Sequence, residues 1–417
     1  MANDWRAVSL GELFRVKHGF AFKSEYFTDE PQATVLVTPG NFAIGGGFQD
    51  GKRKYYNGQL HEDYVLKPGQ VVVTMTDLSK ESDTLGYAAS IPNDSTIWLH
   101  NQRVGLLEFK NEIPTSPRFV EYLLRTHEYR SWIVGSATGT TVKHTAPGRI
   151  ESFTTKIPPI EEQRAIARIL GTLDDKIELN RKQSETLEAM ARTLFKAWFV
   201  DFEPVRAKVE GRWQRGQSLP GLPAHLYDLF PDRLLESELG EIPEGWEGEP
   251  LATSMDFKEG PGIRNWQYTN SDEGIKFINI RCIQGGDLLL DTANRITESE
   301  ANGKYAHFHL QPWDIVVSTS GTLGRSAIVR SEHLPLVLNT SVIRFRSVEG
   351  KTSFSYLYQY LNGSEFLEKL EAMASGSVQR NFGPMHLKQM KLLLSPFDVM
   401  KAYEAICKPI YDQILGS

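Results

Sequence analysis

The chain repeats itself over roughly half of its 417 residues, and this repeat constrains the fold more than any other feature. The segment 67–77 (KPGQVVVTMTD) returns as 311–321 (QPWDIVVSTSG), in both cases a turn followed by a short β-branched strand. The segment 116–124 returns as 353–361, in both cases an amphipathic helix with a serine cap. Each half therefore predicts a mixed α/β fold with short strands, one buried helix, a last strand and a long helix.

A Gly/Ser/Thr loop is also duplicated, since 137–144 (ATGTTVKH) returns as 374–381 (ASGSVQRN). Two related copies in one chain imply a pseudo-twofold arrangement, which suits a bipartite DNA target with two different half-sites. Duplication of a domain with an unrelated function is the alternative interpretation.

The stretch 160–199 between the copies contains no proline and predicts one long helix. Its apolar residues recur with alternating spacings of four and three, which is the seam of a coiled coil rather than the broader face of a helix on a globular core. At about 1.5 Å per residue, the stretch could reach roughly 60 Å. The seam consists of Ile166, Leu170, Leu173, Ile177, the polar pair Asn180 and Ser184, and then Leu187, Ala191, Leu194 and Trp198.

A buried Asn180 fixes the register of such a seam, although a chance polar interruption on a surface helix is the alternative. The seam returns after the second copy at Tyr403, Cys407, Ile410 and Ile414. We expect Pro409 to kink or break this second helix, which is also much shorter than the first.

Net charge leaves DNA binding open, because a formal charge of −6 disfavours nonspecific phosphate binding while local basic clusters remain. The two cysteines, Cys282 and Cys407, have no metal-ligand spacing and predict neither a disulfide nor a metal site. No apolar run is long enough to span a bilayer and no signal peptide is visible, so we expect a cytoplasmic protein without a membrane partner.

Four segments carry a resemblance to a known family. These are 157–167 (IPPIEEQRAIA), 173–180 (LDDKIELN), 194–205 (LFKAWFVDFEPV) and 239–246 (LGEIPEGW). Together they resemble the central conserved region of the specificity subunits of type I restriction-modification enzymes, and the resemblance covers essentially the whole chain. It implies target-recognition domains at 1–155 and 241–395, a central conserved helix at 156–205, a linker at 206–240 and a short C-terminal conserved helix at 396–417.

The resemblance further implies that each domain reads one half of a split double-stranded DNA target, with the unread bases counted by the helical spacer. The spacer would dock methyltransferase subunits, which bind S-adenosylmethionine and methylate adenine, and a translocating nuclease subunit would join them indirectly. No cofactor and no catalytic residue is expected in this chain. It lacks an Asn-Pro-Pro-aromatic loop and a P-loop, and the pair Asp174 and Asp175 lacks the further carboxylates of a nuclease metal site.

Loops rich in basic, amide and hydroxyl side chains are the candidates for DNA contact, because Arg, Lys, Asn and Gln read base edges and Ser, Thr and backbone amides hold phosphates. In the first copy these are Lys52, Arg53, Lys54, Tyr55, Thr140, Thr141, Lys143 and His144, and in the second Arg264, Ser320, Thr322, Arg325, Ser377, Gln379 and Arg380. For each of them, a solvated surface side chain is the alternative. The residues that we expect to make coiled-coil or partner contacts are Ile166, Leu170, Leu173, Ile177, Asn180, Leu187, Leu194, Phe195, Trp198 and Phe199. We expect the four at the end of the helix, Leu194, Phe195, Trp198 and Phe199, to be exposed and to bind a partner.

Two other functions compete with this prediction. A stand-alone sequence-specific DNA-binding or anti-restriction protein would use the same domains without methyltransferase partners. A catalytic nuclease or methyltransferase is disfavoured by the missing motifs.

Overall fold

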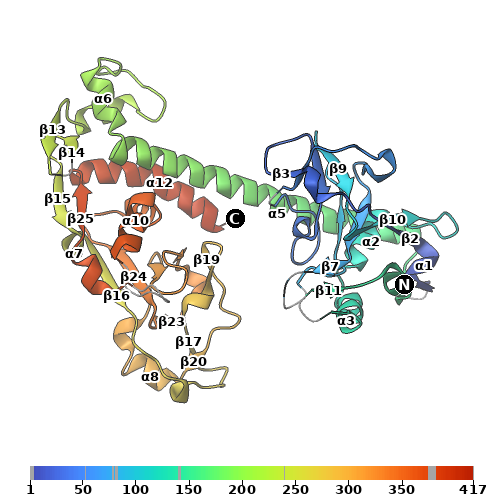
Figure 1. The fold of residues 1–417 in the computed structure, drawn as a ribbon. Coiled ribbons are helices and arrows are strands. Elements are labelled where there is room, and N and C mark those ends of the chain that lie inside the picture. Colours follow the sequence, from blue (N-terminus) through green and yellow to red (C-terminus); the bar gives the residue numbers. More distant parts are fainter. Residues whose placement is uncertain are drawn as a thin grey trace. The chain divides into compact units, whose positions relative to one another are not determined.

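The structure, a computed structural model, describes residues 4–51, 53–77, 79, 83–139, 142–238, 240–373 and 382–416. It divides into two compact units, unit 1 (Met1–Glu178) and unit 2 (Leu179–Ser417). One continuous helix, α5 (Ile160–Phe195), begins in unit 1 and ends in unit 2 (Figure 1). Within the described residues, no helix is long and apolar enough to cross a lipid bilayer.

Unit 1 is built on a four-stranded antiparallel sheet in the order β2-β10-β6-β8. Its strands are β2 (Phe14–His18), β10 (Val104–Phe109), β6 (Val71–Thr74) and β8 (Ala88–Ser90). A second sheet has the order β3-β5-β4-β9, formed by β3 (Phe27–Thr28), β5 (Tyr55–Tyr56), β4 (Thr34–Val37) and β9 (Ile97–His100). Unit 1 also contains the strand pair β1 (Arg6–Ser9) and β12 (Thr154–Ile157) and the helices α1 (Leu10–Leu13), α2 (Pro117–Leu123), α3 (His127–Gly135) and α4 (Pro147–Glu151).

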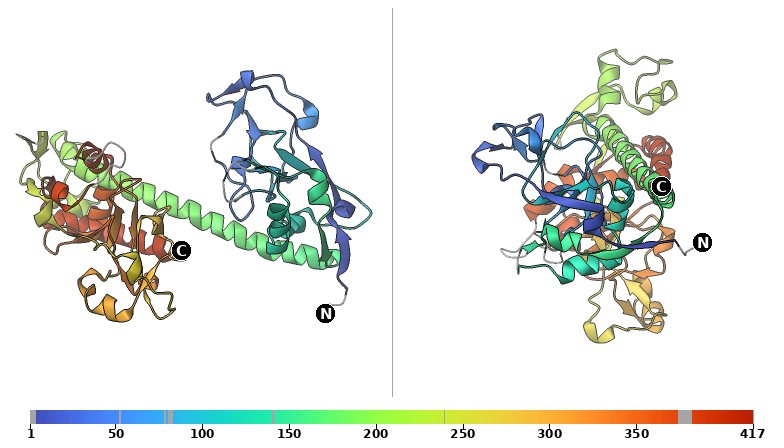
Figure 2. Two further views of the ribbon diagram at one scale, coloured as in Figure 1. Left: turned by 60° about the horizontal axis from the view of Figure 1, so that its bottom comes forward. Right: turned by 90° about the vertical axis from the view of Figure 1, so that its right-hand side faces the viewer.

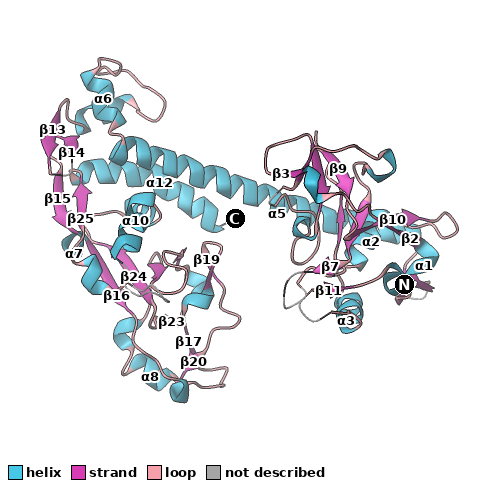
Figure 3. Ribbon diagram, viewed as in Figure 1, coloured by secondary structure: helices cyan, strands magenta, loops and turns pink. Residues whose placement is uncertain are grey.

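Unit 2 repeats the four-stranded antiparallel sheet of unit 1, and its strands are magenta in Figure 3. Its second sheet is three-stranded, in the order β20-β17-β23, formed by β20 (Arg295–Ile296), β17 (Ile275–Phe277) and β23 (Leu336–Val337). Its four-stranded sheet has the order β16-β24-β21-β22, with β16 (Met255–Glu259), β24 (Val342–Ser347), β21 (Ile315–Ser318) and β22 (Ser326–Ile328). The strands β15 (Glu247–Pro250) and β25 (Lys391–Leu394) pair as β1 and β12 do. The helices α9 (Phe354–Leu361), α10 (Ser364–Met373) and α11 (Pro384–Leu387) correspond to α2, α3 and α4.

The apolar runs that revealed the repeat are central strands with both faces buried. In β6, Val71 and Val73 belong to one hydrophobic cluster and Val72 to another. In β21, Ile315 and Val317 are likewise separated from Val316. A strand covered on both faces reads as a continuous apolar run instead of alternating, which explains the sequence of both copies.

The caps of the two buried helices are also equivalent. The hydroxyl of Ser116 accepts a hydrogen bond from Phe119 N, and that of Ser353 accepts one from Tyr356 N. The predicted fold class, two similar mixed α/β units and a long helix, is confirmed.

The last helix, α12 (Phe397–Gly416), runs back along the second half of α5 (Figures 1 and 2). The Tyr403 hydroxyl donates a hydrogen bond of 3.2 Å to the carbonyl oxygen of Ala191. Pro409 lies inside α12 and does not end it, so the prediction of a break is wrong. Burial of Tyr403, Cys407 and Tyr411 on one face holds the helix together and offsets the backbone hydrogen bond that proline cannot make.

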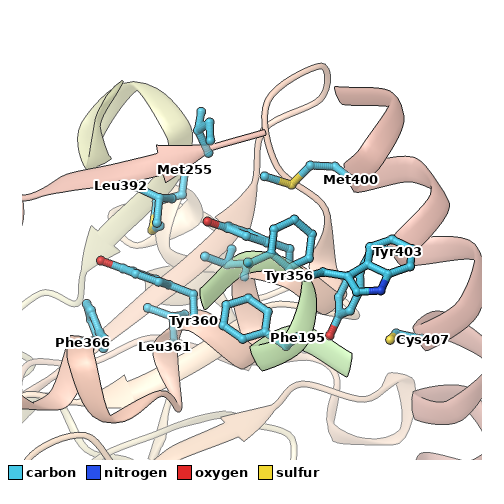
Figure 4. Close-up of a cluster of buried hydrophobic side chains, with 14 of the residues drawn as sticks. Phe195, Met255, Tyr356, Tyr360, Leu361, Phe366, Leu392, Met400, Tyr403 and Cys407 are labelled. Atoms are coloured by element: carbon cyan, nitrogen blue, oxygen red, sulfur yellow. The ribbon is translucent and has the colours of Figure 1, made fainter. Parts of the chain in front are cut away.

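Phe195 at the end of α5, and Trp198 and Phe199 in the π-helical turn η4 (Lys196–Val200) that follows it, belong to the core of unit 2. Figure 4 shows Phe195 in this core with Tyr356 and Tyr403. Phe195 is 9% exposed, Trp198 1% and Phe199 7%, and Leu194 packs against the same cluster. Tyr403 lies within ring-contact distance of all three aromatic residues. The prediction that the helix end is exposed is therefore wrong, because α12 and α9 of the same chain cover it.

Candidate nucleic-acid interface

Four backbone segments of unit 2 meet at one edge of its four-stranded sheet, where β16 and β21 end and β24 and β22 begin. We call this the unit 2 edge and define it as residues 260–267, 319–325, 339–341 and 382–383. Three backbone hydrogen bonds join its segments: Thr340 N donates to Pro261 O at 2.9 Å, Thr319 N to Ser341 O at 2.9 Å and Phe382 N to Thr319 O at 3.2 Å.

Unit 1 has the same edge, which we call the unit 1 edge and define as residues 19–26, 75–77, 79, 83–87, 101–103 and 143–145. Its three equivalent backbone hydrogen bonds are Gln102 N to Phe20 O at 2.9 Å, Met75 N to Arg103 O at 3.0 Å and Thr145 N to Met75 O at 2.9 Å. The two frames therefore agree bond for bond, whereas the side chains they carry differ.

Each edge contains a glycine at a point where two backbone segments approach closely, Gly19 in unit 1 and Gly260 in unit 2. A Cβ on Gly19 would lie 2.1 Å from the carbonyl oxygen of Asn101, and a Cβ on Gly260 would lie 2.1 Å from that of Asn339. Any other residue would collide with backbone at these positions, so the sheet edges are rigid supports for the loops beyond them.

Asp77 organises the loop after β6. Its carboxylate accepts hydrogen bonds from the backbone N–H groups of Ser79, Thr84 and Leu85 and from the Thr84 hydroxyl. Burial alone would raise the pKa of Asp77, but the hydrogen bonds from Ser79 and Thr84 outweigh it and lower the pKa. Asp77 is therefore a fixed anionic anchor that shapes the loop.

In unit 2, the loop after β21 is organised by Ser318. Its hydroxyl donates to Thr322 O at 2.7 Å and accepts from Arg325 N at 3.0 Å, which closes the shorter loop of this copy. Arg325, which is exposed, also donates through its guanidinium to the Thr322 hydroxyl at 3.1 Å.

The structure brings several predicted residues to these edges. Lys143 and His144 form β11 (Lys143–His144), which pairs with β7 (Thr76–Asp77) at the unit 1 edge. His144 is exposed, and its Nδ1 lies 3.1 Å from the Thr76 hydroxyl oxygen. The unit 2 edge holds Arg264, Ser320, Thr322 and Arg325, although Ser320 is buried.

Three predicted residues belong to another sheet. Arg53, Lys54 and Tyr55 lie on or just before β5, and the Arg53 guanidinium binds the Asp50 carboxylate through two hydrogen bonds of 2.9 and 2.6 Å. The hydrogen bond from Arg53 lowers the pKa of Asp50. These contacts support the loop itself. Lys52, Thr140, Thr141, Ser377, Gln379 and Arg380 lie outside the described residues.

The edges also carry exposed residues that the sequence analysis missed, namely Lys23, Gln102, Arg103 and Trp266. Lys23 and Arg264 each precede a short 3₁₀ turn, η1 (Ser24–Tyr26) in unit 1 and η6 (Asn265–Gln267) in unit 2. Trp266 is 80% exposed, which is unusual for so large an apolar side chain. A residue-by-residue alignment of the two copies at Gly19 and Gly260 could have revealed these positions.

Among the residues that the structure describes, no group of three His, Cys, Asp or Glu side chains could hold a metal ion. Cys282 and Cys407 are buried free thiols, and burial raises the pKa of both.

Comparison with known proteins agrees with this geometry. Residues 2–189 match the type I restriction modification DNA specificity domain. The chain is 25% identical over 341 residues to the type I restriction enzyme HindI specificity subunit of Haemophilus influenzae, covering 72% of each chain. It is 24% identical over 338 residues to the EcoBI specificity subunit of Escherichia coli, covering 79% of this chain and 63% of that relative.

The crystal structure of the type I restriction-modification S subunit from M. genitalium has the same fold, with a TM-score of 0.58 at 14% identity over 99% of this chain and 91% of the other. The duplicated fold is that of this S subunit, and the match at residues 2–189 makes unit 1 similar to a DNA specificity domain. Over most of its length the chain is similar to the specificity subunits of type I restriction enzymes, and within it residues 2–189 match the DNA specificity domain.

Proposed function

We propose that the unit 1 edge and the unit 2 edge each read one half of a bipartite duplex DNA target. The observation that carries this proposal is the pair of identical backbone frames with different exposed side chains. Where unit 1 presents Gln102 and Arg103, unit 2 presents Thr340 and Ser341. Two different half-sites require different side chains on the same backbone arrangement, because side chains read base identity at the base edges.

At the unit 1 edge, the proposed contacts are Lys143, His144 and the newly recognised Lys23, Gln102 and Arg103. At the unit 2 edge they are Arg264, Thr322, Arg325 and Trp266, with the backbone at Ser320. Arginine and glutamine would contribute hydrogen bonds to bases, and the backbone and hydroxyl groups would hold phosphates.

We further propose that the length of α5 sets the number of unread bases between the two half-sites, and that α5 binds methyltransferase subunits. Its middle exposes apolar side chains that no helix of a single domain would leave in water, among them Leu173 at 55% and Ile177 at 65% exposure. S-adenosylmethionine would be bound by the methyltransferase partner, and a nuclease subunit would join through that partner.

The test is to co-express the chain with the methyltransferase subunit of its own system and to map methylated adenines in the host DNA. We expect a split sequence that is methylated only when both proteins are present. The proposal fails if the chain does not copurify with the methyltransferase subunit and no split sequence is methylated.

A further inference from the structure

Unit 2 contains a cavity of 610 Å³ beside its edge. Glu188 and Arg192, on the second half of α5, line one side of it. Gly324, Arg325 and Ser326 line another side, and a turn at 285–286, between β18 (Ile283–Gln284) and β19 (Asp287–Leu288), lines a third. The cavity thus lies between α5 and the loop that joins β21 to β22.

In unit 1 the equivalent space is filled by an arginine. Arg125 lies against the glycine turn 45–47, where a Cβ on Gly46 would be 2.6 Å from the Arg125 Cγ. The Arg125 guanidinium donates hydrogen bonds of 2.7 Å to Glu121 and 2.9 Å to Asp174. A cation held by two carboxylates therefore closes this position in the first copy.

Asn362 follows the N-cap residue Ser353 by the same number of residues as Arg125 follows the N-cap residue Ser116, so the two residues occupy equivalent positions in the sequence repeat. Tyr358 and Gln359 likewise replace Glu121 and Tyr122. The shorter Asn362 does not reach the glycine turn, and a Cβ on Gly285 or Gly286 would meet nothing within 4 Å. The second copy has lost the filling side chain and the carboxylate pair, which leaves the cavity.

The charged groups of the cavity favour an anion. Two guanidinium groups, those of Arg192 and Arg325, face one carboxylate, that of Glu188. Burial raises the pKa of Glu188. The lining also includes the amides of Gln284 and Asn362, each of which donates one hydrogen bond within the protein, to Arg281 O and Tyr358 O, and has a second N–H to donate to a ligand. A positive surplus with many donors is suited to a phosphate.

Arg325 belongs both to the cavity and to the unit 2 edge, so DNA lying on that edge would bring its backbone to the cavity mouth. We propose that the cavity receives a sugar-phosphate segment of the DNA at the second half-site, with the phosphate held between Arg192 and Arg325. This proposal rests on the proposed function and adds the spacer helix to the DNA contacts. The contact is independent of base sequence and occurs only at unit 2, because Arg125 fills the position in unit 1.

The test is the Arg192→Gln variant in the assembled complex with the methyltransferase subunit. Loss of one phosphate contact makes the slope of log affinity against log salt shallower by about 0.9. Preference for the correct bases in both half-sites should not change, because Arg192 lies outside the recognition loops. Arg192→Lys should keep most of the slope, since it keeps the charge. Arg181→Gln, on the same helix but outside the cavity lining, should leave the slope as it is.

An unchanged slope for Arg192→Gln on a recognised target overturns the cavity proposal alone. A weaker subunit assembly with an unchanged slope also overturns it, and would mean that a carboxylate of the methyltransferase subunit occupies the cavity. An equal loss for Arg181→Gln would show a nonspecific charge effect and would overturn it as well. If the wild-type complex recognised no split target, the proposed function would fall together with it.

Discussion

The hydroxyl of Tyr122 donates a hydrogen bond of 2.9 Å to the carboxylate of Asp174, which ties α2 of unit 1 to the first half of α5. In unit 2, Gln359 Nε2 donates one of 2.6 Å to the hydroxyl of Tyr411, which ties α9 to α12. The four residues occupy equivalent positions of the two copies. In each unit, a helix of the repeat is therefore joined to a long helix at the same position, but by a different pair of hydrogen-bonding side chains.

Replacing Asp174 with alanine should loosen α2 from α5. The variant removes the acceptor of Tyr122 and one of the two carboxylates that bind Arg125. Because Asp174 is partly exposed, we expect a cost of about 1–2 kcal/mol. Hydrogen exchange of the α2 amides should then be roughly 5–30 times faster. The exposed neighbour Asp175→Ala is the control, and equal rates in the two variants would contradict the expectation.

The stability of unit 1 should fall in mild acid because of His100. This residue is fully buried, and its Nε2 donates to Val104 O at 2.9 Å. Burial lowers the pKa of His100 from 6.5 to about 4, although the hydrogen bond to Val104 partly opposes this shift. Below pH 6.5 the unfolded chain takes up a proton that the folded chain refuses until about pH 4, so roughly 3 kcal/mol is lost across that interval.

The measurement for His100 is urea unfolding of unit 1 followed between pH 7 and pH 4. His100→Gln keeps an amide donor but cannot titrate, so its stability should depend less on pH in this interval. A pH profile identical to that of the wild type would rule His100 out as the cause.

Substitutions at the two edges should alter separate halves of the target. Arg103→Ala should relax base preference in the first half-site only, and Arg264→Ala in the second half-site only. Loss of a bidentate base contact costs about 1–3 kcal/mol, which is at least a several-fold change in discrimination. Sequencing of methylated adenines with each variant checks this, and relaxation of both half-sites by one substitution would contradict separate reading.

Ile177, in the middle of α5, and Trp198, in the π-helical turn η4 (Lys196–Val200) that follows α5, belong to the same apolar seam in the sequence but should behave in opposite ways. Trp198→Ala opens a cavity in the aromatic core of unit 2 and should cost about 3–5 kcal/mol of stability. Ile177→Ser, on the exposed stretch, should change stability by less than about 1 kcal/mol and instead weaken copurification with the methyltransferase subunit. Thermal unfolding and pull-down of both variants separate the two roles. A stable Trp198→Ala protein that loses its partner would reverse this assignment.

The fold was largely predictable because apolar strands and capped helices leave local patterns, and these occur twice. The covering of Trp198 was not, because a heptad seam shows that a helix needs a neighbour without showing which one. Arg53 illustrates a second limit, since its pairing with Asp50 depends on a loop conformation that no spacing encodes. Arg103 was missed because its loop contains neither a repeat motif nor a cluster of charge, and only the sheet brings it to the same edge as Lys143.

The loop between β6 and β8 and the loop between β21 and β22 each start and finish on neighbouring strands that are already paired. At the same edges, Gly19 and Gly260 each lie close to a backbone carbonyl oxygen. Additions or losses at a loop tip consequently leave the sheet register as it was. The segment between β6 and β8 is longer than the one between β21 and β22, yet both sit on the same frame. If the edges read DNA as proposed, a chain organised in this way could acquire a new DNA preference during evolution by changing a few loop residues, without a change of fold.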